Sequence, residues 1–248
     1  VGTGSPPYLG LEYVEGQTLH DRVASQGPLS PRETARVGEG IASALAAAHA
    51  AGVLHRDLKP RNVMLGHDGR VRVLDFGLAQ QLDLDGVPIG ESGGSSSAAP
   101  RGLQGTPGYL APELWRGGAG SPASDVWALA VVLLHALEGA PPLRGGTLAN
   151  SRRLALDANP RALTASVAQR APTLARVLAR ALDSDPERRP SAREVASTLA
   201  EVQRSRPSDE AALEPSPFRG LAPFGVKDSA FFFGRDEEVD ELLARLHD

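Results

Sequence analysis

His55-Arg56-Asp57-Leu58-Lys59-Pro60-Arg61-Asn62 is the stretch that decides the fold of this chain, together with Asp75-Phe76-Gly77. The two segments supply a carboxylate, an ammonium, an amide and a second carboxylate at fixed spacing. This inventory suits the transfer of a phosphoryl group, which asks a protein mainly for positioning and charge neutralisation. The chain has only two lysines, and one of them, Lys59, lies inside the stretch.

Each requirement of phosphoryl transfer has a candidate side chain here. Asp57 can accept the proton of an attacking hydroxyl and orient that hydroxyl, while Lys59 can neutralise the transferred phosphate. Asn62 and Asp75 offer oxygen ligands to Mg²⁺, which prefers hard oxygens that it shares with phosphate groups. We therefore expect Asp57, Lys59, Asn62 and Asp75 to form one catalytic site, with Asn62 and Asp75 as the metal ligands.

A β-hairpin explains the distance between the two segments along the chain. Residues 62–65 and 71–74 are short apolar runs on either side of a glycine-bounded turn at 66–69, a pattern that predicts two paired strands. Asn62 lies at the start of the first strand and Asp75 just after the second, so the hairpin brings the two residues close together.

Residues typical of helix ends predict the first long helix. Ser30-Pro31-Arg32-Glu33 combines a capping serine, a proline at the first helical position and a glutamate that completes a capping box. Gly52 is expected to end this helix. Gly38 and Gly40 each cost a helix about 1 kcal/mol relative to alanine, so tertiary packing must hold it together.

Other segments carry weaker signals. Residues 122–137 are apolar on nearly all sides and predict a central helix, and 174–182 and 191–202 predict two more. The last of these begins with a second Ser-x-x-Glu capping box. Residues 8–14 resemble the end of a strand.

Composition excludes several classes of protein. The absence of cysteine rules out disulfides and thiolate metal sites, and no apolar run reaches the ~20 residues of a membrane span. A formal net charge of −4 gives no reason to expect nucleic acid as a partner. No signal peptide is visible, so we expect a cytoplasmic location.

These residues resemble the eukaryotic-type protein kinase family, and the agreement extends beyond the opening stretch. Residues 105–113 resemble the substrate-binding loop that ends in Ala-Pro-Glu, and Asp125-Val126-Trp127 resembles the start of the central helix, whose aspartate braces the catalytic loop. In this resemblance Arg189 pairs with Glu113. The implied fold is α+β, a mainly helical C-terminal lobe with a small β-hairpin.

The resemblance also implies ATP as the cofactor beside Mg²⁺. Residues 11–14 resemble the hinge that binds adenine, which places Glu12 and Val14 at the nucleotide, and Met64 would lie under the adenine ring. Lys59 and Thr106 resemble the Ser/Thr branch of the family, in which the Thr106 hydroxyl would bridge Asp57 and Lys59. The implied substrates are therefore Ser and Thr residues of proteins, and the nearest resemblance is to bacterial Ser/Thr kinases.

A regulatory loop is a further expectation. In the family, an arginine in the position of Arg56 commonly receives a phosphorylated residue of the activation loop. Here that loop begins at Leu78, ends at Leu110 and contains several serines. We expect autophosphorylation at one of these serines or at Thr106.

The two ends of the chain suggest a piece of a longer signalling protein. No lysine precedes Lys59 to anchor the ATP phosphates, so we expect the N-terminal lobe to be largely absent. We assign residues 1–204 to a partial kinase domain (hinge plus C-terminal lobe), 205–217 to a linker and 218–248 to the beginning of a second domain. That last segment resembles the entry to STAND-type signalling NTPases.

Three functions remain open on the sequence. The first is a protein Ser/Thr kinase within a multidomain bacterial signalling protein, of which this chain alone would be inactive. The second is a non-catalytic, kinase-like module that regulates an adjoining STAND-type NTPase. The third places the main activity in the NTPase and makes the kinase its input. The intact residues Asp57, Lys59, Asn62 and Asp75 favour the first, since a scaffold has no physical need for acids that converge on a metal.

Overall fold

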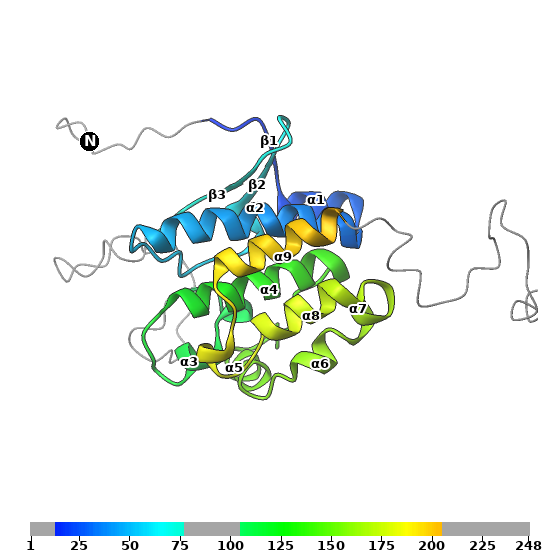
Figure 1. Cartoon of the computed structure of the whole chain (residues 1–248). Coiled ribbons are helices and arrows are strands. Elements are labelled where there is room, and N and C mark those ends of the chain that lie inside the picture. Colours follow the sequence, from blue (N-terminus) through cyan, green and yellow to red (C-terminus); the bar gives the residue numbers. More distant parts are fainter. Residues whose placement is uncertain (1–12, 77–104, 205–248) are drawn as a thin grey trace, which may run out of the picture. The chain divides into compact units, whose positions relative to one another are not determined.

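The computed structural model describes residues 13–76 and 105–204, and Figure 1 shows their arrangement. Within these residues helices dominate over a small antiparallel sheet, as expected of an α+β, mainly helical fold. The helices are α1 (Leu19–Gln26), α2 (Pro31–Ala50), α3 (Pro112–Trp115), α4 (Pro122–Glu138), α5 (Leu148–Leu156), α6 (Pro160–Leu163), α7 (Ala165–Arg170), α8 (Pro172–Ala181) and α9 (Ala192–Arg204). The strands are β1 (Gly16–Thr18), β2 (Val63–Gly66) and β3 (Val71–Val73), and short 3-10 turns span Pro60–Asn62, Pro107–Tyr109 and Pro186–Arg188.

Both predicted capping boxes are present. At the start of α2 the Ser30 hydroxyl accepts from the Glu33 backbone N–H at 3.2 Å, and the Glu33 carboxylate accepts from the Ser30 N–H at 2.9 Å. Ser191 and Glu194 make the same two bonds at the start of α9, at 3.3 and 2.7 Å. These reciprocal bonds satisfy N–H groups that a helix start otherwise leaves unpaired.

The glycines of α2 mark where other elements approach it closely. A Cβ on Gly38 would lie 2.7 Å from Leu133 Cδ1 of α4 and 2.8 Å from Leu199 Cδ1 of α9. A Cβ on Gly40 would lie 2.7 Å from Val71 Cβ of β3. The predicted packing of α2 is thus confirmed, and Figure 1 shows α9 running alongside this helix.

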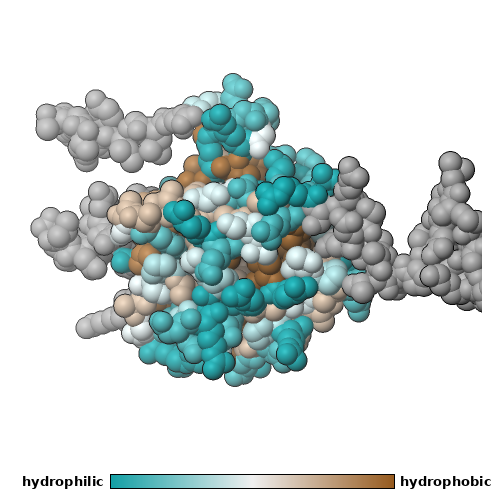
Figure 2. Space-filling view, viewed as in Figure 1, coloured by the Kyte–Doolittle hydropathy of each residue, from teal (hydrophilic) through white to brown (hydrophobic). Residues whose placement is uncertain are grey.

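Helix α4 forms the centre of the hydrophobic core. Its residues 124–137 are all buried, and it packs against α2, α8 and α9. The expectation of a central helix at 122–137 is confirmed. Hydrophilic residues cover most of the lower half of the face shown in Figure 2, over the helices that surround α4.

The sheet has the strand order β1-β2-β3, with both pairs antiparallel. The predicted hairpin is confirmed, since Val63 pairs with Val73 and Leu65 with Val71. The predicted strand end at residue 14 is wrong, because residues 13–15 are outside any strand and β1 begins at Gly16. Pairing with β2, rather than the local apolar run, defines this strand.

Helix α1 was not expected, although its start carries a signal. The Thr18 hydroxyl accepts from the Asp21 backbone N–H at 3.1 Å, which is a side-chain cap. Leu19 and Val23 bury its inner face. None of the helices in the described part of the chain is long and apolar enough to cross a membrane.

Candidate active site

Hydrogen bonds to α4 hold the loop at 54–59. The Asp125 carboxylate, only 2% exposed, accepts from the backbone N–H groups of His55 and Arg56, each at 2.9 Å. It also contacts His49 Nε2 of α2 at 2.8 Å. Arg56 has φ 68°, a left-handed conformation that is uncommon outside glycine. The expected bracing of this loop by Asp125 is therefore present.

His55 fastens the same loop to the hairpin. Its Nε2 donates to the Leu74 carbonyl at 2.9 Å, and its Nδ1 accepts from the Asp57 N–H at 3.3 Å. The ring also lies against Phe76, with centroids 4.8 Å apart. Burial lowers the pKa of His55, which outweighs the opposing effect of the Asp125 charge. A neutral ring with one donor and one acceptor suits both contacts.

Asp57, Lys59 and Thr106 form one hydrogen-bonded cluster. The Thr106 hydroxyl donates to Asp57 Oδ1 at 2.8 Å, and Lys59 Nζ donates to Thr106 Oγ1 at 3.2 Å. Lys59 Nζ also forms an ion pair with Asp57 Oδ2. The expected bridge by Thr106 is thus present. All three side chains are partly exposed, so a substrate can reach them.

Asn62 and Asp75 come close through the hairpin. The Leu74 N–H donates to the Asn62 carbonyl at 2.8 Å, and Asp75 is the residue that follows Leu74. Asn62 is buried, and its Nδ2 donates to the Asp57 backbone carbonyl at 2.9 Å. Asp75 is exposed with φ 60°. The geometry fixes Asn62 next to Asp57 and leaves the Asp75 carboxylate open to solvent.

The donor set fits Mg²⁺ that is shared with phosphate oxygens. The amide N–H of Asn62 is used by Asp57, so its side-chain oxygen stays available as an acceptor. A carboxylate and an amide oxygen are suitable hard ligands, and such sites usually complete the shell with phosphates and water. No cluster of three or more His, Cys, Asp or Glu residues suited to a metal occurs in the described ranges.

The residues expected at the nucleotide are only partly described. Met64 lies in the middle strand β2, paired with Thr18 on one side and Arg72 on the other. Val14 precedes β1 and is partly exposed. Glu12 and most of the loop expected to carry phosphorylation, including all its serines, lie outside the described residues.

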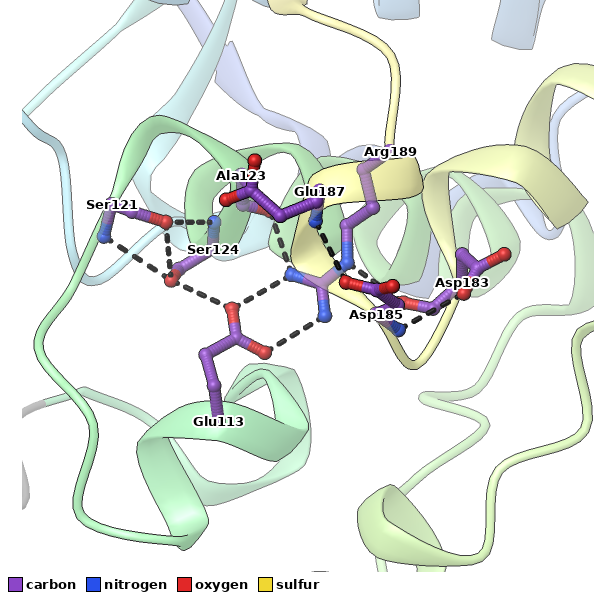
Figure 3. A network of polar contacts seen from close by, with 8 residues as sticks. All are labelled: Glu113, Ser121, Ala123, Ser124, Asp183, Asp185, Glu187 and Arg189. Atoms are coloured by element: carbon purple, nitrogen blue, oxygen red, sulfur yellow. Dashed lines mark hydrogen bonds and ion pairs between the residues drawn. The ribbon is translucent and has the colours of Figure 1, made fainter.

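A second network surrounds the Glu113 carboxylate of α3 (Figure 3). Arg189 binds the Glu113 carboxylate in a two-pronged ion pair, with distances of 2.7 and 2.8 Å. Ser124 of α4 donates to the same carboxylate at 2.8 Å. Arg189 further donates to the carbonyls of Ala123 and Asp183, at 2.9 and 2.8 Å. The expected pairing of Arg189 with Glu113 is confirmed.

Burial and charge oppose one another at this ion pair. Burial raises the pKa of Glu113, but hydrogen bonds and the charge from Arg189 outweigh it, so the pKa lies below its usual value. The Arg189 side chain is fully buried and also lies over the Trp127 ring, 5.1 Å from its centroid. The ion pair and the bond to Ala123 therefore join α3 and the first turn of α4 to the segment between the 3-10 turn Pro186–Arg188 and α9.

Two contacts near the site were not expected from the sequence. Ser124 joins the Glu113 network, and a capping box at Ser121 was the available signal. The Tyr109 hydroxyl lies 2.8 Å from His135 Nδ1 in α4. No local pattern links Tyr109 and His135, since only the fold brings them together.

Comparison with known proteins agrees with this geometry. The family model described as "Protein kinase domain" matches residues 3–199, and this chain belongs to that family. A second model, "Novel STAND NTPase 1", matches residues 217–248, in agreement with the expected resemblance of this segment.

The similar curated proteins are bacterial kinases by name. Serine/threonine-protein kinase PrkC of Bacillus subtilis is 38% identical over 138 residues, which cover 56% of this chain and 20% of PrkC. Serine/threonine-protein kinase PknB of Mycobacterium tuberculosis is 32% identical over 207 residues, which cover 83% of this chain and 32% of PknB. The chain thus spans about a fifth to a third of the length of these relatives.

Proposed function

We propose that this chain is the catalytic lobe of a protein serine/threonine kinase, which transfers the γ-phosphate of ATP to Ser or Thr hydroxyls of proteins. The observation that carries the proposal is the cluster of Asp57, Lys59 and Thr106, with Asn62 bonded to the backbone of Asp57. The names of the similar bacterial proteins support the same reaction.

The roles follow from the chemistry of each side chain. Asp57 receives the substrate hydroxyl at its partly exposed carboxylate, orients it and accepts its proton. Lys59 lies beside that carboxylate and stabilises the negative charge of the transferred phosphoryl group. Thr106 fixes the position of both side chains by its hydroxyl.

Asn62 and Asp75 would hold Mg²⁺, which supplies charge neutralisation at the phosphates. We propose that Val14 and Met64, with Glu12, border the adenine. We also propose that the expected activation loop is phosphorylated by the enzyme itself. A cytoplasmic location accords with the need for ATP.

The proposed organisation assigns residues 1–204 to the kinase domain, 205–217 to a linker and 218–248 to an NTPase-like segment. The family matches at 3–199 and 217–248 support it, as does a division of the chain into units 1–205 and 206–248.

The test uses the full-length protein that carries this chain, purified with Mg²⁺, labelled ATP and a general Ser/Thr protein substrate. Asp57→Asn should lower the rate of phosphate transfer by about 10²–10⁴-fold. Asp157→Asn is the matched control, because Asp157 is exposed at the end of α5 and is not among the hydrogen-bond partners of Asp57, Lys59 and Thr106. Equal rates in wild type and Asp57→Asn would contradict the proposal.

The second candidate function is a non-catalytic module that regulates a STAND-type NTPase, favoured by the match at 217–248. It predicts that Asp57→Asn leaves NTPase turnover and its regulation unchanged in the full-length protein. A kinase that controls the NTPase by phosphorylation predicts that the same substitution changes that turnover.

A further inference from the structure

A cavity of about 740 Å³ lies directly beside the Asp57 cluster. Lys59 and Thr106, which both donate hydrogen bonds to the Asp57 carboxylate, also line this cavity. A substrate chain whose hydroxyl is held at Asp57 would therefore lie next to the cavity. An extended chain advances about 3.3 Å per residue, so side chains within about four residues of the hydroxyl can reach it.

The lining of the cavity is basic. Its ionisable residues in the described part of the chain are His20, Lys59, Arg61, Tyr109, His135 and Arg144, and no Asp or Glu is among the lining residues. Lys59 is engaged by Asp57, which leaves the guanidinium groups of Arg61 and Arg144 as the cations that face a ligand. Both arginines are exposed.

The neighbours of these arginines do not neutralise them. An Arg61 N–H donates to His20 Nε2 at 2.8 Å, and since guanidinium has no acceptor this bond orients Arg61 without using its charge. No ion pair of Arg61 or Arg144 is found among residues 13–76 and 105–204.

The floor of the cavity is neutral and polar. Tyr109 and His135 contact each other at 2.8 Å. Burial raises the pKa of Tyr109 to about 12, and burial lowers the pKa of His135, with His20 adding to the effect. At neutral pH this pair adds no negative charge that would compete with an anionic ligand.

We propose that this cavity selects substrates with an Asp or Glu side chain close to the phosphorylated Ser or Thr, and that Arg61 and Arg144 bind that carboxylate. The inference rests on the proposed kinase function and names its substrate class. Arginine is well suited to this role, because its planar donors match a carboxylate in two-pronged geometry.

The first test is binding, which needs no phosphate transfer. The 248-residue chain, labelled with ¹⁵N, is titrated with a Ser-containing peptide that carries Glu near the serine, and with matched peptides that carry Gln or Lys instead. We expect the Glu peptide to shift the NMR signals of Gly108 and Tyr109. Its affinity should be at least about fivefold higher than that of the Gln peptide. Equal shifts with all three peptides, or the same shifts with inorganic phosphate alone, would overturn the inference.

The second test is specificity in the full-length protein. The ratio of kcat/KM for Glu and Gln peptides should fall to about one in the double variant Arg61→Gln, Arg144→Gln, while Arg61→Lys with Arg144→Lys should retain part of the preference. Arg176→Gln is the control for the loss of an arginine, because it is exposed on α8 and does not line the cavity.

The two tests separate the inference from the function on which it rests. Phosphorylation of all peptides without regard to Glu would overturn the inference and leave the kinase proposal standing. Selective binding of the Glu peptide without phosphorylation of any peptide would contradict the kinase proposal and support the charge preference of the cavity.

Discussion

The Asp125 carboxylate accepts a hydrogen bond from the backbone N–H of Arg56 at 2.9 Å, where Arg56 has φ 68°. A left-handed conformation in a non-glycine residue costs energy and persists only where its surroundings impose it. Asp125 is buried in α4, the most buried helix of the core, so the core itself imposes the conformation of the loop that presents Asp57.

Asp125→Ala should destabilise the protein by about 2–4 kcal/mol. The substitution leaves one buried and one partly buried backbone N–H group, those of His55 and Arg56, without their charged acceptor and also removes the partner of His49. Urea unfolding followed by circular dichroism measures the change. Asp157→Ala, at an exposed position, should stay within about 0.5 kcal/mol of wild type, and a similar loss in both variants would contradict the role of Asp125.

Thr106→Val should reduce phosphate transfer by the full-length protein about 10- to 100-fold. The hydroxyl bonds to two charged groups, and the loss of one such bond costs about 1.5–3 kcal/mol, which is about 10- to 100-fold in rate, while valine keeps the shape. Peptide phosphorylation rates measure the effect. Thr106→Ser retains the hydroxyl and should restore most of the activity, and failure of this rescue would mean that packing rather than hydrogen bonding matters here.

The stability of the protein should depend on pH through Glu113. Its pKa is lowered in the folded state, so its contribution to stability is fully present above its ordinary value of 4.5 and is lost as pH falls from there. Urea midpoints from pH 7 down to pH 3, measured for wild type and Glu113→Gln, check this. The fall below the ordinary pKa should be shallower in Glu113→Gln, whereas Glu15→Gln, at an exposed position, should follow wild type.

Gly40→Ala should destabilise the protein by about 1–3 kcal/mol, although alanine is the better helix former. The new methyl would lie 2.7 Å from Val71 Cβ, and overpacking of this kind outweighs the gain of about 1 kcal/mol in helix propensity. Thermal and urea unfolding measure the change. Ala47→Gly, at an exposed position of the same helix, gives the propensity difference alone, and stabilisation by Gly40→Ala would show that β3 can move away.

The 248-residue chain alone should show negligible phosphate transfer. Kinases anchor the ATP phosphates with a strand lysine, and this chain has no lysine before Lys59, which is already paired with Asp57. Release of labelled phosphate from ATP, with and without a peptide, measures the activity. Turnover that is lost in Asp57→Asn would contradict this prediction.

Much of the fold could be predicted because its signals are local. The capping boxes at Ser30 and Ser191 each involve residues three apart, and the hairpin between β2 and β3 depends on one short turn. The proximity of Asn62 and Asp75 follows from that hairpin. The pairing of Arg189 with Glu113 could be stated only through the family resemblance, since no local pattern joins two residues so far apart.

The amino-acid sequence alone predicts the family, the residues that suit phosphate transfer and four of the described helices, α2, α4, α8 and α9. Three features appear only in the folded molecule: the start of β1, the left-handed loop at Arg56, and the basic cavity lined by Arg61, Arg144, Tyr109 and His135. The difference lies in how far apart along the chain the interacting residues are. Caps and turns are set by neighbouring residues, whereas a cavity and a braced loop exist only after the core around α4 has brought distant segments together.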